Sequence, residues 1–230
     1  MLPPVMREYD VKQALYEMEI GRLLEQDPDS LVVDELGIME GKYRIDVAVI
    51  SGKLHGYEIK SASDNLERLP AQQESYSRIF DKMTLVADER HVAEAVRIIP
   101  PWWGLIAVSI RDGRPHLNEI WPSRQNINID KLLVCQLLWR QEVLEILTAL
   151  GLDFGVRTKS RRLMWQRLAD SLELDQLRRI IGAKLKARGN WRVPGLKEPV
   201  ERKPRKRRKT RRKRRKVYSP LPGGKSPLRV

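Results

Sequence analysis

The stretch that decides the fold is residues 44–76, RIDVAVISGKLHGYEIKSASDNLERLPAQQESY. Its first half predicts two β-strands, over 44–50 and 55–61, because apolar and β-branched residues dominate both runs. The tripeptide Ser51-Gly52-Lys53 between them has turn chemistry. We therefore expect the two strands to form a hairpin.

A helix is predicted over residues 64–81. Asp64 can cap its start, and Glu67, three residues on, can complete a capping box. Residues four apart lie on one side of a helix. Three polar side chains at that spacing should share one stripe: Arg68, Gln72 and Tyr76.

The flanking sequence continues the same alternation of helices and strands. Further strands are predicted at 31–36, 83–87 and 103–110, and further helices at 8–26 and 91–99. From Lys131 the apolar spacing becomes purely helical, with helices expected over 131–151, 160–172 and 174–186. The fold class is thus α/β, a mixed sheet flanked by helices, followed by a small all-α region. We expect a core at 1–125, a basic helical region at 126–193 and a disordered polycationic tail at 194–230.

Charge is distributed unevenly along the 230 residues, whose formal net charge is +14. Residues 1–120 carry 14 basic and 21 acidic residues, whereas residues 121–196 carry 14 and 7. Residues 197–230 carry 16 basic and 2 acidic residues, including 11 basic residues in the twelve-residue run RKRRKTRRKRRK. Such a run repels itself when free and binds polyanions. The partner expected from composition is therefore a nucleic acid.

Several classes of protein are excluded by the same composition. No apolar run approaches the roughly 20 residues of a membrane helix, so no membrane partner is expected. The single cysteine, Cys135, excludes an internal disulfide and a cysteine-ligated zinc site, and its apolar neighbours indicate core packing. Trp102 and Trp103 could stack on bases, but packing under the sheet is favoured. We expect a cytoplasmic, nucleoid-associated protein of prokaryotic or phage origin.

Three residues of the hairpin could form a metal centre. Glu58 and Lys60 are two apart on a strand and project to the same side, while Asp46 lies on the neighbouring strand. Two carboxylates can ligate one Mg²⁺, and a lysine beside them could act on a water. The alternative is structural, because Glu-x-Lys often forms a solvated cross-strand ion pair and Asp46 could be paired with Arg44 or Lys60.

Asp46, Glu58-Ile59-Lys60 and a glutamine on the next helix together resemble the PD-(D/E)XK nuclease superfamily. The longer string RIDVAVI, GYEIKS and RLPxQ is similar to a bacterial and phage branch of it. The resemblance implies a restriction-endonuclease-like fold, with Asp46 and Glu58 binding Mg²⁺ or, in its place, Mn²⁺. It also implies that Lys60 is the catalytic lysine and that Gln72 orients water or substrate.

Two further points concern the match to the PD-(D/E)XK motif. Its leading proline is replaced by Ile45. A further acidic ligand often joins such a site from the preceding element; Glu35 is our first choice and Glu19 the alternative. Arg68 could contact a phosphate or brace the glutamine, with a purely structural role equally open.

Cations outside the core should contact the nucleic acid. Arg157, Lys159, Arg161 and Arg162 cluster at a helix entrance, and further cations follow at 178–188. No base-reading motif accompanies them, so phosphate contacts are expected. The tail adds the largest group: Arg205, Lys206, Arg207, Arg208, Arg211, Arg212, Lys213, Arg214 and Arg215.

The sequence therefore predicts a Mg²⁺-dependent DNA endonuclease, acting in repair, recombination, defence or phage DNA processing. The alternatives are a non-catalytic DNA-binding protein on a nuclease-like fold, and an RNA nuclease or RNA-binding protein. The sequence also allows a homodimer, because the apolar helix at 131–150 could form a dimer interface or could cover the protein's own core.

Overall fold

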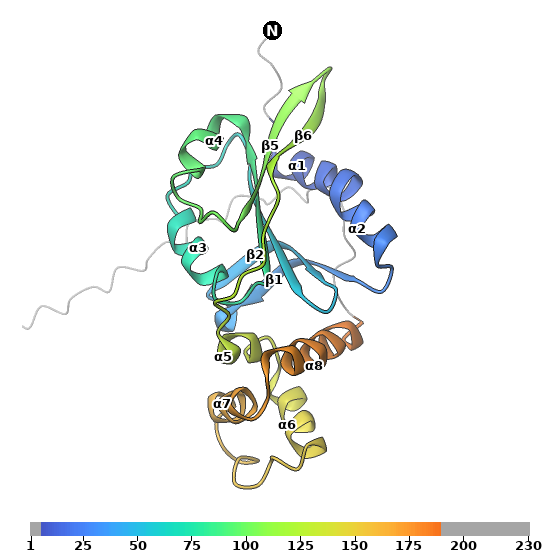
Figure 1. The fold of residues 1–230 in the computed structure, drawn as a ribbon, viewed down its shortest axis with the longest axis vertical. Helices are drawn as coiled ribbons and strands as arrows, with labels where there is room; N and C mark the ends of the chain where they lie inside the picture. The colour runs from blue at the N-terminus through green and yellow to red at the C-terminus, as the bar shows by residue number, and fades with distance from the viewer. Residues whose placement is uncertain (1–5, 190–230) are drawn as a thin grey trace, which may run out of the picture. The chain divides into compact units, whose positions relative to one another are not determined.

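The computed structural model describes residues 6–189, which are built around a six-stranded mixed sheet (Figure 1). The strands follow one another across the sheet in chain order. The strands β3, β4 and β5 run parallel, and the other neighbours pair antiparallel. The bounds are β1 Leu31–Ile38, β2 Tyr43–Ile50, β3 Leu54–Lys60, β4 Lys82–Asp88, β5 Gly104–Arg111 and β6 Arg114–Trp121.

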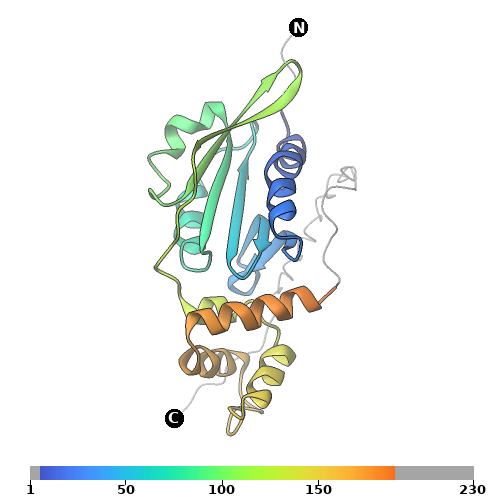
Figure 2. The ribbon, with the colours of Figure 1, turned by 45° about the vertical axis from the view of Figure 1, so that its right-hand side comes forward.

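Helices cover both faces of this sheet (Figure 1). On one face lie α1 (Glu8–Leu15) and α2 (Gly21–Gln26), joined by a π-helical turn; on the other lie α3 (Leu69–Tyr76) and α4 (Glu89–Ala95). Four helices gather beyond one end of the sheet (Figure 2): α5 Lys131–Cys135, α6 Arg140–Ala149, α7 Arg161–Ser171 and α8 Leu174–Ala187. The predicted mixed α/β class with a helical C-terminal part is confirmed. Its restriction-endonuclease-like detail stays a prediction.

The predicted hairpin is confirmed, since β2 and β3 pair antiparallel from Ile50 opposite Leu54 to Val47 opposite Tyr57. Gly52 in its turn has a φ of +83°, a conformation in which an L side chain would be strained. The hairpin is the part of the sheet that carries Asp46 and Glu58.

The predicted helix at 64–81 is shorter in the structure. It begins at Leu69, followed by Pro70, a residue that suits the first helical turn. Asp64 instead accepts hydrogen bonds from the backbone amide of Ser61 at 2.7 Å and from its hydroxyl at 2.6 Å. The expected capping box is therefore wrong, because Asp64 caps the turn after β3.

Two further elements differ from the sequence prediction. Strand β6 was not expected, because it is an edge strand with polar residues and Pro115 near its start. The single helix expected over 131–151 is two helices, α5 and α6. Trp139 is extended before α6, and its amide donates to Glu142 Oε2 at 2.7 Å, so a new helix starts there.

The core lies in two layers, one on each face of the sheet. Val11, Leu15 and Ile20 pack with β2 and β3 residues on the α1 face. On the other face Trp103 and Phe80 belong to a cluster that continues into the helical region. Among residues 6–189, no helix is both long and apolar enough to cross a membrane.

Helices α5 and α6 contribute buried side chains to the chain's own core. Leu133, Cys135, Leu138 and Leu147 are all buried in the cluster that also contains the sheet residue Ile50. Burial raises the pKa of the Cys135 thiol to about 12, as suits a packing residue. Of the two roles considered for 131–150, the structure favours the lid on the protein's own core.

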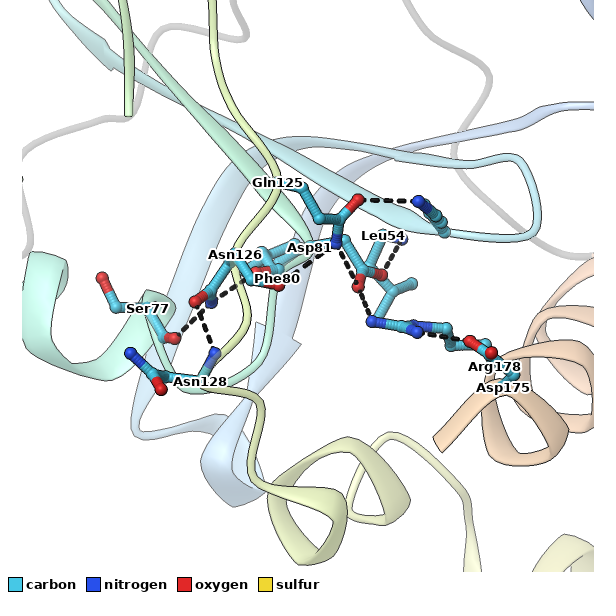
Figure 3. A network of polar contacts seen from close by, with 10 residues as sticks. Leu54, Ser77, Phe80, Asp81, Gln125, Asn126, Asn128, Asp175 and Arg178 are labelled. Atoms are coloured by element: carbon cyan, nitrogen blue, oxygen red, sulfur yellow. Dashed lines mark hydrogen bonds and ion pairs between the residues drawn. The ribbon is translucent and has the colours of Figure 1, made fainter. Parts of the chain in front are cut away.

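A buried ion pair joins α8 to the sheet (Figure 3). The Arg178 guanidinium donates to Asp81 Oδ1, and the two side chains are 12% and 2% exposed. Asp81 Oδ2 accepts from the Leu54 amide at the start of β3 at 2.9 Å, and Gln125 Nε2 donates to Oδ1 at 3.3 Å. Asn126 continues the network by donating to the Ser77 carbonyl at 2.6 Å. These bonds fix the helical region to the β3–β4 end of the sheet.

Candidate functional site

Asp46 lies where β2 and β3 separate. The ladder between the two strands ends at Val47 opposite Tyr57, one residue short of Asp46. Asp46 Oδ2 accepts a hydrogen bond from the Ile59 amide at 2.7 Å, so the carboxylate replaces the missing backbone acceptor. One oxygen of this predicted metal ligand therefore has a structural bond.

The other three predicted catalytic residues form, together with Tyr76, a hydrogen-bonded cluster on β3 and α3. We call it the Glu58 cluster (Glu58, Lys60, Gln72 and Tyr76). Glu58 Oε1 accepts from Lys60 Nζ at 2.6 Å and from Gln72 Nε2 at 2.5 Å. Lys60 Nζ also donates to Gln72 Oε1 at 3.0 Å. The Tyr76 hydroxyl accepts from Gln72 at 3.3 Å and donates to the Arg44 carbonyl at 2.9 Å.

This cluster is almost completely removed from solvent. Glu58 is 1% exposed, Lys60 4% and Gln72 8%, and Glu58 Oε2 has no hydrogen-bond partner in the described part of the chain. Burial raises the pKa of Glu58 even though Lys60 favours the charged form. Burial, and then the negative charge of Glu58, raise the pKa of Asp46 well above its ordinary value. Both carboxyls would gain from a nearby cation.

Glu35 and Glu8 lie beside Asp46. The β1–β2 register passes from Asp34 opposite Val47 to Leu36 opposite Ile45, leaving Glu35 and Asp46 outside the ladder. Glu35 has a φ of +57°, a strained conformation for a residue with a side chain. One carboxylate oxygen each of Glu8, Glu35 and Asp46 lie within 4.8 Å of one another.

The structure thus places Glu35, the first choice for an added acidic residue, next to Asp46. Glu19, the alternative, lies apart from this group: it pairs with Arg22 at 2.7 Å and accepts from the Tyr57 hydroxyl at 3.5 Å. Sequence reasoning missed Glu8. It is the first residue of α1, and only the packing of that helix on the sheet brings it to Asp46.

Arg68 does not share the surroundings of Gln72 and Tyr76. It is exposed at the residue before α3, whereas Gln72 and Tyr76 are buried in that helix. Trp103 is fully buried, as the packing interpretation predicted, and its indole donates to Ser77 Oγ at 3.2 Å.

The predicted cations around the start of α7 are all exposed, but their bonds differ. Arg157 pairs with Asp153 at 2.5 Å, and Arg161 pairs with Glu40 at 2.5 Å. Lys159 and Arg162 have no ion-pair partner within residues 6–189, and neither has Arg167 further along α7, which the sequence interpretation did not single out.

The second group of cations, at 178–188, serves mainly the fold. Arg178 bonds Asp81, Lys184 pairs with Glu145 at 2.8 Å, and Arg188 pairs with Glu142 at 2.6 Å. Only Arg179 and Lys186 of this group are exposed without a partner in the described part of the chain. The expectation that all five contact DNA needs correction, because three are held by carboxylates. The predicted tail cations lie outside the described residues: Arg205, Lys206, Arg207, Arg208, Arg211, Arg212, Lys213, Arg214 and Arg215.

The family model described as Bacteriophage P4 protein cII matches residues 4–193. Protein cII of Enterobacteria phage P4 is 25% identical over 186 residues, which are 80% of this chain and 68% of that relative. A solved structure, the SPO1766 protein of unknown function from Silicibacter pomeroyi, is 18% identical and covers 67% of this chain and 99% of its own. Its TM-score of 0.37 supports neither a fold nor a function.

The expectation of a Mg²⁺-dependent deoxyribonuclease is wrong, because the matching family is that of a phage cII protein and not of a nuclease. Lys60 and Gln72, expected to act on water and substrate, are bonded to Glu58 and nearly inaccessible, and their expected roles stay predictions. The expectation was a protein of prokaryotic or phage origin, and the matching family is that of a phage protein. Since the family model spans most of the sequence, the chain belongs to the Bacteriophage P4 protein cII family.

Proposed function

We propose that this protein is a non-catalytic DNA-binding protein of the phage, which holds the phosphate backbone through its helical region and basic tail. The observation that carries the proposal is a set of exposed cations on and around α7 that have no ion-pair partner within residues 6–189, namely Lys159, Arg162 and Arg167. Cations that have no carboxylate partner are free to displace the counterions of DNA.

The charge of this region supports the same function. Residues 157–192 carry 11 basic and 3 acidic residues, and the following tail carries a still larger excess. Much of the affinity of a protein for DNA comes from neutralising phosphates and releasing counterions. Helices α5–α8 share a core with the sheet, and the Asp81–Arg178 pair adds a fixed link. The cations of the helical region are therefore carried by helices that pack firmly against the sheet.

In this proposal the Glu58 cluster has a structural role. Glu58, Lys60 and Gln72 hydrogen-bond one another across β3 and α3, and Tyr76 extends the network to the backbone of β2. A buried ion pair of this kind is stable only with further hydrogen bonds, which Gln72 supplies. The cluster thus fixes α3 on the sheet without needing a substrate.

Binding of the full chain to labelled duplex DNA tests the proposal, with the affinity measured across a range of salt concentrations. Replacing Lys159, Arg162 and Arg167 with alanine should reduce the log–log salt slope by about 2.7, since each lost phosphate contact contributes about 0.9. The matched control replaces Arg68, Arg97 and Arg111, exposed cations of the sheet region, with alanine.

The control variant has the same change in net charge and should keep the wild-type slope. Equal losses in the two triple variants would show that only total charge matters and would refute the assigned surface. Binding to RNA but not to DNA would refute the proposed DNA-binding function and support the RNA-binding alternative.

A second proposal is that Glu8, Glu35 and Asp46 hold a divalent cation, Mg²⁺ or Mn²⁺, without catalysis. Three carboxylate oxygens within 4.8 Å of one another are hard ligands of the kind that Mg²⁺ prefers. The pKa of Asp46 is raised first by burial and then by the charges of Glu58 and Glu8, and a bound cation would stabilise the charged form of this carboxyl.

Thermal unfolding with and without Mg²⁺ or Mn²⁺ tests this site. At about 100 times the dissociation constant, a bound ion stabilises the folded state by about 2.7 kcal/mol. Glu8→Gln should abolish the rise in Tm, whereas Glu25→Gln, at an exposed position on α2, should keep it. A wild-type Tm that neither ion raises would exclude the site.

A further inference from the structure

The loop between α6 and α7 holds an apolar side chain out in solvent. Phe154 is 89% exposed, more than any other large apolar residue of the described chain. Scattered surface apolar residues are common and need no function. Phe154 differs because the backbone on both sides of it is anchored.

Hydrogen bonds fix the loop before and after Phe154. The Leu152 amide donates to the Leu147 carbonyl at 2.7 Å. Asp153, 9% exposed, accepts from Thr148 Oγ1 at 2.9 Å and from Arg157 Nε at 2.5 Å. Val156 is buried in the core of the helical region. With Asp153 and Val156 buried on either side of Phe154 and Gly155, the Phe154 ring remains in solvent.

The same loop carries the cations that could receive an anionic partner. Arg157 follows Phe154 by three residues and is 66% exposed; its Nε bonds Asp153, which leaves both terminal nitrogens as donors. Lys159 is exposed and has no ion-pair partner within residues 6–189. An aromatic ring and two exposed cations within six residues of one loop suit a nucleotide, which has a flat base and a phosphate.

We propose that Phe154 stacks on an unpaired base of single-stranded DNA, while Arg157 and Lys159 contact the flanking phosphates. The inference rests on the proposed DNA-binding function and specifies its substrate, because a base inside a duplex has no free face to offer. Stacking requires no base-specific hydrogen bond, so the contact tolerates any sequence.

The experiment compares the full chain with Phe154→Ala, Phe154→Leu and Phe154→Trp on single-stranded oligonucleotides. Stacking is worth about 1–3 kcal/mol per base, and 1.4 kcal/mol is tenfold in affinity. Phe154→Ala should therefore bind about 5- to 150-fold more weakly. Phe154→Leu should lose most of the affinity too, since it is apolar but not aromatic, and Phe154→Trp should retain it.

An oligonucleotide with abasic positions separates stacking from other contacts. Wild type should bind it as weakly as Phe154→Ala binds the intact strand, and Phe154→Ala should bind both strands equally. Ile127→Ala serves as the control, because Ile127 is 87% exposed outside this loop and should not affect binding. Unchanged Tm values would show that the variants remain folded.

The outcomes separate this inference from the function on which it rests. If Phe154→Ala binds DNA as tightly as wild type, the stacking contact alone is overturned. The same holds if Phe154→Ala lowers the affinity equally for intact and abasic strands. Absence of binding to any DNA by wild type would overturn the proposed function together with the inference.

Discussion

Removing Arg178 should destabilise the whole described structure, because it leaves a buried carboxylate without its cation. Asp81 is 2% exposed, and Arg178 is the one cation that bonds it among residues 6–189. Breaking one side of a buried ion pair costs about 3–5 kcal/mol. The Leu54 amide and Gln125 continue to hydrogen-bond Asp81, so we expect Arg178→Ala to lie near the lower limit, at about 3 kcal/mol.

The contact of Arg178 with Asp175 adds little to this value. The Asp175 side chain is 83% exposed, and exposed ion pairs contribute about 0–1 kcal/mol. For a protein of this size 1 kcal/mol shifts Tm by about 2–4 °C. Arg178→Ala should therefore lower Tm by about 6–12 °C.

Urea unfolding followed by circular dichroism measures the effect. Arg179→Ala is the matched control, because this neighbouring arginine is exposed without a partner in the described structure, and it should stay within about 0.5 kcal/mol of wild type. The double variant Asp81→Asn with Arg178→Ala should cost less than the two single changes added together. A wild-type stability for Arg178→Ala, or an equal loss in Arg179→Ala, would refute the reasoning.

Two other predictions concern pH and the tail. Burial lowers the pKa of His55 to about 3, against about 6.5 when unfolded, so stability should fall by about 1.4 kcal/mol per pH unit as the pH drops from 6.5 toward 3. His55→Gln should remove that contribution from the pH dependence of urea unfolding; identical pH profiles would contradict it. Deleting residues 197–230 removes 16 basic residues and should weaken DNA binding and flatten its salt dependence, with Tm unchanged. Full affinity at low salt after the deletion would rule out a role for the tail.

The local pattern of the sequence is sufficient to predict the hairpin and the positions of Glu58 and Lys60 on it. Alternation and a Gly-containing turn predict β2 and β3, and the spacing of Glu58 and Lys60 places both on one face of a strand. The neighbouring helix brings Gln72 to them, as the sequence predicted. These are short-range relations, in which strand and helix periods fix direction over a few residues.

The chemistry of these residues was decided by the tertiary structure. The same residue types can form an open metal site or a closed hydrogen-bonded cluster, and the sequence does not distinguish the two. Glu58, Lys60 and Gln72 are nearly inaccessible and hydrogen-bond one another, while Glu58 Oε2 has no partner among residues 6–189. The nuclease suggested by the residue types is contradicted by the family match.

Charge is the clearest case of what the sequence determines and what it does not. Composition by itself shows the basic helical region and the polycationic tail, because counting needs no structure. It cannot show that Arg178 bonds Asp81, 97 residues away, while Arg179 has no ion-pair partner among the described residues, or that Glu8 lies beside Asp46. A charged side chain can form an ion pair within the fold or remain exposed for a partner. The outcome depends on which groups, distant in sequence, pack beside it, and only the tertiary structure decides that.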